Sequence, residues 1–126
     1  MTVVNGPDLL YEDRPARRIA NPFAESGPGE SSARQVILHP VDRRSPHLHP
    51  HSEEVVYVIE GSGRVWIDGE SHPVRPGSWV RIPAGTPHAT LAAEPMLLAC
   101  FFPHHDLAQN IEELDVVIET DQEERS

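Results

Sequence analysis

The chain has 126 residues, one cysteine, and a formal net charge of −10 from 10 basic and 20 acidic residues. This length fits one domain with its own core, the lone cysteine excludes an internal disulfide, and the negative charge would repel the phosphate backbone of nucleic acid. No stretch approaches the roughly 20 apolar residues of a membrane-spanning helix, and the first 20 residues are too charged for a secretory signal. We therefore predict a cytoplasmic protein without a nucleic-acid or membrane partner.

The first 32 residues contain four prolines and the run Ser-Gly-Pro-Gly at 26–29. Prolines and glycines at this density interrupt regular structure. We predict an extended arm over 1–32 that either packs on a neighbouring subunit or stays mobile. A barrel domain is predicted to follow over 33–105, and an acidic segment and tail over 106–126.

Short apolar runs alternate with glycine and proline from residue 33 onward, which is typical of β-structure. Asp68-Gly69 is a signal for a two-residue hairpin turn. Strands with turn signals at such short spacing are typical of a sandwich or barrel, so the predicted fold class is all-β. The predicted strands cover 33–41, 55–59, 63–67, 72–75, 78–82 and 96–102, with a loop over 83–87.

The segment from residue 106 onward has eight acidic residues and one basic residue, Arg125. Such a run is most often a solvated face. The pattern predicts a short helix over 106–114, a last strand over 116–118, and a solvated tail over 120–126.

A histidine-rich run lies directly before the apolar strand at 55–59. Residues i and i+2 of a strand point to one face, so His47 and His49 can converge, with Glu54 joining them from the next strand. Two imidazoles and a carboxylate are suitable ligands for a divalent metal. A lone His-x-His pair would favour a solvated histidine-rich turn, but a second segment of this chain favours the metal site.

The spacing of this run matches the motif G-x5-H-x-H-x3,4-E-x6-G. His47, His49, Glu54 and Gly61 stand at the motif positions, and Val41 stands where the motif begins with glycine. Fifteen residues then separate this motif from a second one.

The second motif reads G-x5-P-x-G-x2-H-x3-N. Gly77, Pro83, Gly85 and His88 match it, and Ala92 stands where the motif ends with asparagine. With both motifs in this order, the chain resembles the cupin superfamily, and specifically its small single-domain members. The resemblance covers roughly residues 33–103.

The resemblance implies a jelly-roll β-barrel, or double-stranded β-helix, with an extended N-terminal arm and a short C-terminal helix or strand. In that family three histidines and one glutamate hold one divalent transition metal, and for this chain we expect Fe, Mn, Ni or Zn. The positions that match those ligands are His47, His49, Glu54 and His88.

Two neighbours compete with these ligands. Glu53 is expected to point away, because Glu54 alone satisfies the spacing on both sides of the motif. Strand alternation places His51 on the ligand side, but Pro50 interrupts the strand and the family does not use this position. The other histidines are expected to be ordinary surface or hydrogen-bonded residues: His39, His72, His104 and His105.

Alternation also predicts the lining of a substrate pocket. Cys100 either faces this pocket or fills core, where it would behave as a small apolar residue, and Ala92 would give a less polar wall than asparagine. The predicted pocket residues are His51, Val56, Ala92, Leu98, Cys100 and Phe102.

Two strands that we expect to be neighbours, 63–67 and 78–82, have an aliphatic face and a face that combines tryptophan with arginine. The aliphatic face is expected to be core. The second face fits an interface between protein subunits, where both residue types are enriched, and the resemblance to small cupins, many of which associate through sheet faces, implies a homodimer. The alternative is a pocket wall that binds a carboxylate. The aliphatic residues are Val65, Ile67, Val80 and Ile82, and the interface candidates are Arg64, Trp66, Trp79 and Arg81.

A six-coordinate metal with four protein ligands keeps two open positions. The resemblance therefore implies a metal-dependent monocupin enzyme of the oxygenase type acting on a small organic substrate, with no catalytic residue predicted beyond the ligands. The alternatives are a redox-silent zinc or nickel isomerase, lyase or cyclase, and a non-catalytic cupin that binds a small ligand. Metal affinity is expected to fall as the pH drops through the histidine range.

Overall fold

The computed structural model describes residues 1–119, and its regular secondary structure is almost entirely antiparallel β-strand. One group of strands comprises β1 (Tyr11–Arg14), β2 (Arg17–Ala20), β3 (Ser32–Leu38), β6 (Glu54–Glu60), β9 (Trp79–Ile82) and β11 (Met96–Phe102). A second group comprises β5 (His47–Leu48), β7 (Gly63–Ile67), β8 (Glu70–Val74), β10 (His88–Ala92) and β12 (Glu112–Glu113). A separate pair comprises β4 (Arg43–Arg44) and β13 (Ile118–Glu119).

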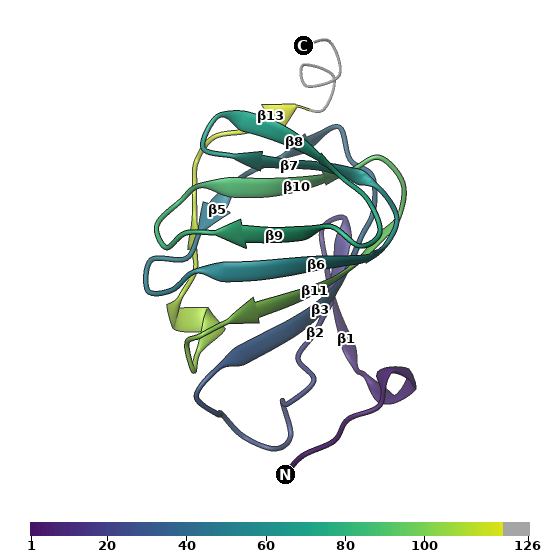
Figure 1. The fold of residues 1–126 in the computed structure, drawn as a ribbon, viewed down its shortest axis with the longest axis vertical. Coiled ribbons are helices and arrows are strands. Elements are labelled where there is room, and N and C mark those ends of the chain that lie inside the picture. The colour runs from purple at the N-terminus through teal and green to yellow at the C-terminus, as the bar shows by residue number, and fades with distance from the viewer. Residues whose placement is uncertain (120–126) are drawn as a thin grey trace.

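The first group forms a six-stranded sheet in the order β1-β2-β3-β11-β6-β9, and the second a five-stranded sheet in the order β12-β5-β10-β7-β8. Figure 1 shows the strands following one another along the long axis of the molecule, with the β1–β2 hairpin at one end. This is the jelly-roll barrel that the motifs predict, and the all-β fold class is confirmed. Among residues 1–119, no helix has the length and apolar character needed to cross a lipid bilayer.

The core lies between the two sheets and follows the alternation of the strands. Burial alternates along β6 and β11, where every second side chain points inward. Val65 and Ile82 are buried in this core, and Ile67 and Val80 pack against it as partly buried residues. Its buried members are Val36, Leu38, Val56, Val58, Val65, Val74, Ile82, Ala92, Met96, Leu98, Cys100 and Phe102.

The strands β7 and β9 lie in different sheets, which corrects the prediction that they are neighbours. β7 pairs with β8 and β10, whereas β9 pairs with β6. Arg64 and Trp66 therefore lie on the outside of one sheet, and Trp79 and Arg81 on the outside of the other. Alternation determines which residues share a face of one strand, but it does not determine which sheet the strand joins.

The N-terminal region contains a hairpin, where the sequence predicts an extended arm. Pro15 and Ala16 form its turn, with Ala16 at a φ of 59°, and β2 pairs along β3. The Ala16 carbonyl also accepts a hydrogen bond of 2.9 Å from the amide of His39. Pro15 thus marks the turn between two short strands, and the hairpin forms one edge of the six-stranded sheet.

The C-terminal segment is less helical than predicted. In place of a helix over 106–114 it has one 3-10 turn, η2 (Leu107–Gln109), which the Asp106 side chain caps by accepting from the amide of Ala108. The segment then runs along one side of the barrel to β12 and β13 (Figure 1). The strand predicted over 116–118 is β13, shifted toward the C-terminus, and the predicted tail over 120–126 lies outside the described residues.

Two glycines explain local features of the barrel. Asp68 and Gly69 both have positive φ, 45° and 92°, as a two-residue hairpin turn between β7 and β8 requires. Gly61 ends the first motif with a φ of 79°, and a Cβ there would lie 2.1 Å from the carbonyl oxygen of Pro95. Only glycine fits that close approach of two chain segments.

Candidate metal centre

Four side chains from both sheets meet inside the barrel. His47 on β5 stands opposite His88 on β10 in the five-stranded sheet, and Glu54 begins β6 in the six-stranded sheet. With His49, they offer four ligand atoms that all lie within 4.8 Å of one another. The structure therefore brings together the four residues that the motifs single out.

Two of the imidazoles are oriented by main-chain carbonyls. His88 Nδ1 lies 2.9 Å from the carbonyl oxygen of Thr86, and His49 Nδ1 lies 2.7 Å from that of Asn110. A carbonyl only accepts, so each Nδ1 carries a proton and donates it. In a neutral ring the Nε2 atom then has a free lone pair that faces the centre, as metal-binding histidines require.

The Glu54 carboxylate is 5% exposed and lies between these rings. Its Oε1 atom is 2.9 Å from His88 Nε2 and 3.2 Å from His49 Nε2. Burial by itself would raise the pKa of Glu54, but the neighbouring imidazoles of His49 and His88 lower it to about 2. Burial, reinforced by the charge of His88, lowers the pKa of His47 to about 3. At neutral pH the carboxylate is ionised and His47 is neutral, which are the forms that bind a metal.

The donor set fits a divalent cation. His49 Nε2 is buried and makes no hydrogen bond, although it lies 3.2 Å from Glu54 Oε1. Two imidazole lone pairs facing one carboxylate oxygen repel each other unless a cation or a proton lies between them. Three imidazole nitrogens and one carboxylate oxygen, without thiolate, suit Fe, Mn, Ni or Zn.

Asn110 holds the ligand loop and was missed by the sequence analysis. It is fully buried; its Nδ2 donates to Ser52 Oγ at 2.7 Å, and its Oδ1 accepts from the His51 amide at 2.7 Å. Its carbonyl accepts from His49. The acidic composition around Asn110 predicts a solvated segment. The local feature that could have indicated its role is an uncharged amide between two short elements, η2 and β12.

A cavity of about 90 Å³ adjoins the centre. Four of the predicted pocket residues line it: Val56, Leu98, Cys100 and Phe102. Burial raises the pKa of the Cys100 thiol, and the Glu54 carboxylate raises it further, so this thiol stays protonated. Cys100 thus belongs to the core and also faces the cavity.

The other candidates lie elsewhere. His51 is exposed and stacks on His104, with ring centroids 5.6 Å apart, because Pro50 ends the strand before it. Ala92 is buried at the far end of β10, opposite Gly63. Glu53 points away from the centre, as predicted, and its carboxylate lies 3.5 Å from Arg81 Nε.

Three arginines that the sequence analysis did not single out also line the cavity. Arg17 comes from β2, Arg34 from β3 and Arg44 from β4. No motif contains them. Arg17 and Arg44 reach the cavity because the N-terminal hairpin and β4 fold against the barrel, whereas Arg34 lies on the barrel strand β3 itself.

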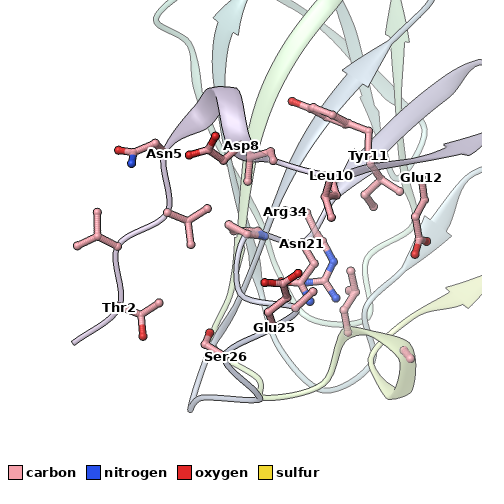
Figure 2. Close-up of a pocket in the computed structure, with 18 of the residues that line it drawn as sticks. Thr2, Asn5, Asp8, Leu10, Tyr11, Glu12, Asn21, Glu25, Ser26 and Arg34 are labelled. Atoms are coloured by element: carbon pink, nitrogen blue, oxygen red, sulfur yellow. The ribbon is translucent and has the colours of Figure 1, made fainter.

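A second, larger hollow of about 940 Å³ lies beside the N-terminal segment. Figure 2 shows that segment, with Thr2, Asn5 and Asp8, along one side of the hollow. Arg34 lines this hollow as well as the cavity at the centre. The hollow contains none of the four convergent ligands, so the metal centre is the stronger candidate site.

Comparison with known proteins gives a family match over 34–102, to the family described as "Cupin domain". Polyketide synthase CurC from Streptomyces cyaneus is 46% identical over 52 residues, which are 41% of this chain and 34% of that protein. The chain thus spans about a third of the length of this relative. An uncharacterized protein from Methanocaldococcus jannaschii is 32% identical over 101 residues, covering 77% of this chain and 79% of its own length.

Quercetin 2,3-dioxygenase from Bacillus subtilis is 35% identical over 48 residues, which are 38% of this chain and 14% of that enzyme. Among solved structures, KdgF from Halomonas sp. superposes with a TM-score of 0.72 at 21% identity. That superposition covers 86% of this chain and 98% of KdgF. At this identity the likeness concerns the fold alone.

Proposed function

The chain belongs to the cupin domain family, and we propose that it is a metal-dependent enzyme acting on a small organic molecule. The main support for this proposal is that the ligand atoms of four residues lie within 4.8 Å of one another: His47, His49, Glu54 and His88. Because main-chain carbonyls fix two of the rings before any ion arrives, little ordering is needed when a metal binds. Such preorganisation is typical of a built metal site.

The residues around the centre have separate tasks in this proposal. A bound divalent metal would supply Lewis acidity and, in the case of iron or manganese, redox chemistry with dioxygen. Glu54 serves as a ligand and is not free to act as a base. Leu98 and Phe102 exclude water from the cavity beside it, and Cys100 contributes a protonated thiol to its wall.

The similarity to quercetin 2,3-dioxygenase supports an oxygenase-type reaction as the specific form of this proposal. The same ligands also accept zinc or nickel, which would give a redox-silent isomerase, lyase or cyclase. A cupin that only binds a small ligand is the third possibility. The identity of the metal separates oxygen chemistry from Lewis-acid chemistry, and turnover separates an enzyme from a binding protein.

The test begins with protein purified without a nickel column. Elemental mass spectrometry should find about one Fe, Mn, Ni or Zn per chain, and oxygen uptake with candidate substrates should accompany iron or manganese. His88→Ala should lose most of the metal, whereas His72→Ala, at an exposed position, should keep it. Unchanged metal content in His88→Ala, or no metal in the parent protein after each ion is offered, would contradict the proposal.

A cytoplasmic homodimer is also part of the proposal. The outer face of the six-stranded sheet exposes Ile59, Trp79 and Phe101, and Trp79 is 69% exposed. Trp79 packs on Tyr57 of the neighbouring strand, with ring centroids 4.4 Å apart. An apolar face of this kind fits a second copy of the chain, and light scattering of the purified protein would give the oligomeric state.

A further inference from the structure

The cavity beside the metal centre is strongly basic. Among the described residues that line it, Glu54 is the only acidic one, while Arg17, Arg34 and Arg44 are all present. Glu54 faces the histidines, so it does not neutralise the arginines. A bound divalent cation would make the cavity more positive still, so the cavity favours an anion.

Arg44 is the arginine of this cavity that has buried N–H donors without an acceptor. Its Nε and Nη2 atoms are buried and make no hydrogen bond. Glu113 lies close enough to raise the pKa of Arg44, but burial and the charge of Arg17 lower it. Leaving a buried charged donor unsatisfied costs free energy that an anion in the cavity would offset.

Arg17 and Arg34 differ in how far the protein already satisfies them. Arg34 Nη1 donates to the carbonyl of Ala33 at 2.8 Å, and Asp106 and Glu12 lie near enough to raise its pKa. The charge of Arg17, in contrast, acts on Arg44 and on His47 and lowers the pKa of both. Arg17 and Arg44, which both line the cavity, therefore repel each other, and an anion bound to both would offset that repulsion.

We propose that this cavity binds the carboxylate of a small organic acid on Arg44, with Arg17 beside it. The guanidinium fork matches the two oxygens of a carboxylate. The volume of about 90 Å³ and the apolar walls formed by Val36, Leu38 and Leu98 suit a short carbon skeleton. The inference that this acid is the substrate rests on the proposed function, since the metal centre would supply the reaction.

Thermal unfolding tests the carboxylate site without knowledge of the substrate. The metal-loaded and metal-free proteins are compared at constant ionic strength with acetate, pyruvate or malonate, with the matching amides, and with inorganic phosphate. Carboxylates should raise Tm relative to chloride because they bind the folded state, and amides should not. Arg44→Gln should weaken carboxylate binding about tenfold or more, whereas Arg75→Gln, which removes the same charge at an exposed position, should have no effect.

Two further variants keep the test decisive if Arg44→Gln does not fold. Arg44→Lys retains the charge without the fork and should weaken binding less, and Arg17→Gln should weaken it while leaving Arg44 in place. The proposal is overturned if no carboxylate raises Tm, if phosphate alone does so, or if the shift survives Arg44→Gln because the anion sits on the metal. If only the proposed metal function is wrong, the protein will contain no metal but will still show the Arg44-dependent rise in Tm with carboxylates.

Discussion

His49 donates its Nδ1–H to the main-chain carbonyl of Asn110 over 2.7 Å, although the two residues lie 61 positions apart in the sequence. The Asn110 side chain holds the same loop through Ser52 and the amide of His51. One residue of the C-terminal segment thus fixes both the direction of an imidazole ring in the candidate metal centre and the loop that carries this ring.

Asn110→Ala should therefore weaken both the fold and the metal centre. The variant keeps the carbonyl but leaves the His51 amide without its acceptor and the Ser52 oxygen without the Asn110 donor, so we expect a loss of about 2–3 kcal/mol in the free energy of unfolding. Metal affinity should fall about tenfold, as for other residues that orient ligands. Urea unfolding and metal titration measure the two effects, with the exposed neighbour Gln109→Ala as control. Equal metal affinity in both variants would contradict the role of Asn110.

Gly61→Ala should be one of the most destabilising single-methyl changes in the chain. The new Cβ would meet the Pro95 carbonyl oxygen at 2.1 Å, in addition to the strain of a φ of 79°. We expect a loss of about 3 kcal/mol or more. Gly69→Ala is a matched comparison, because its φ is also positive but nothing lies within 4 Å of the new Cβ. It should cost about 1 kcal/mol, and equal losses for the two variants would rule out the steric explanation.

The stability of the metal-free protein should fall as the pH is lowered from about 6.5 toward 3. The unfolded chain protonates His47 near its ordinary pKa of 6.5, whereas the folded chain holds that pKa at about 3. Between these values the unfolded state binds more protons, so acid favours unfolding by up to about 1.4 kcal/mol per pH unit. Urea unfolding at pH 7 and pH 5 measures the slope. His47→Gln should have a shallower slope than the parent, and an unchanged slope would assign it to other groups.

The Cys100 thiol should react slowly with thiol reagents in the folded protein. It is buried, and burial together with the Glu54 carboxylate raises its pKa, so the reactive thiolate is scarce at pH 8. Absorbance with a disulfide reagent should show slow modification that becomes complete within minutes in denaturant. Fast modification of the folded protein would mean that the cavity opens to solvent or that the thiol is ionised.

The motifs predict which four side chains come together, because the spacing of residues within each motif determines which side chains share a face or a turn. His47 and His49 stand two apart at a strand, Gly61 allows the close approach that the turn after β6 needs, and Asp68-Gly69 forms the predicted turn. The family and the all-β fold follow from these local patterns. The four candidate ligands are brought together in the structure for the same reason.

Contacts between distant segments were beyond prediction. Arg17 and Asn110 reach the centre from segments that the local pattern predicts as an extended arm and a short helix. Arg44 follows the strand predicted over 33–41, in a segment for which no element is predicted. Trp66 and Trp79 were placed on one face because alternation gives no information on which sheet receives a strand. In both cases the local sequence does not reveal which short strands pair. Some of these strands are only two residues long, and their position depends on contacts that exist only in the folded barrel.

The register that places His88 opposite His47 joins chain segments about 40 residues apart, and Glu54 enters from the other sheet. Such non-local pairings form late, after most of the loop-closure entropy has been lost. A metal ion that needs all four side chains would contribute little to the folding transition state, so it would slow unfolding much more than it speeds folding. The metal-loaded protein would then persist because it unfolds slowly. In the presence of proteases, the molecules that have lost their metal would be degraded first.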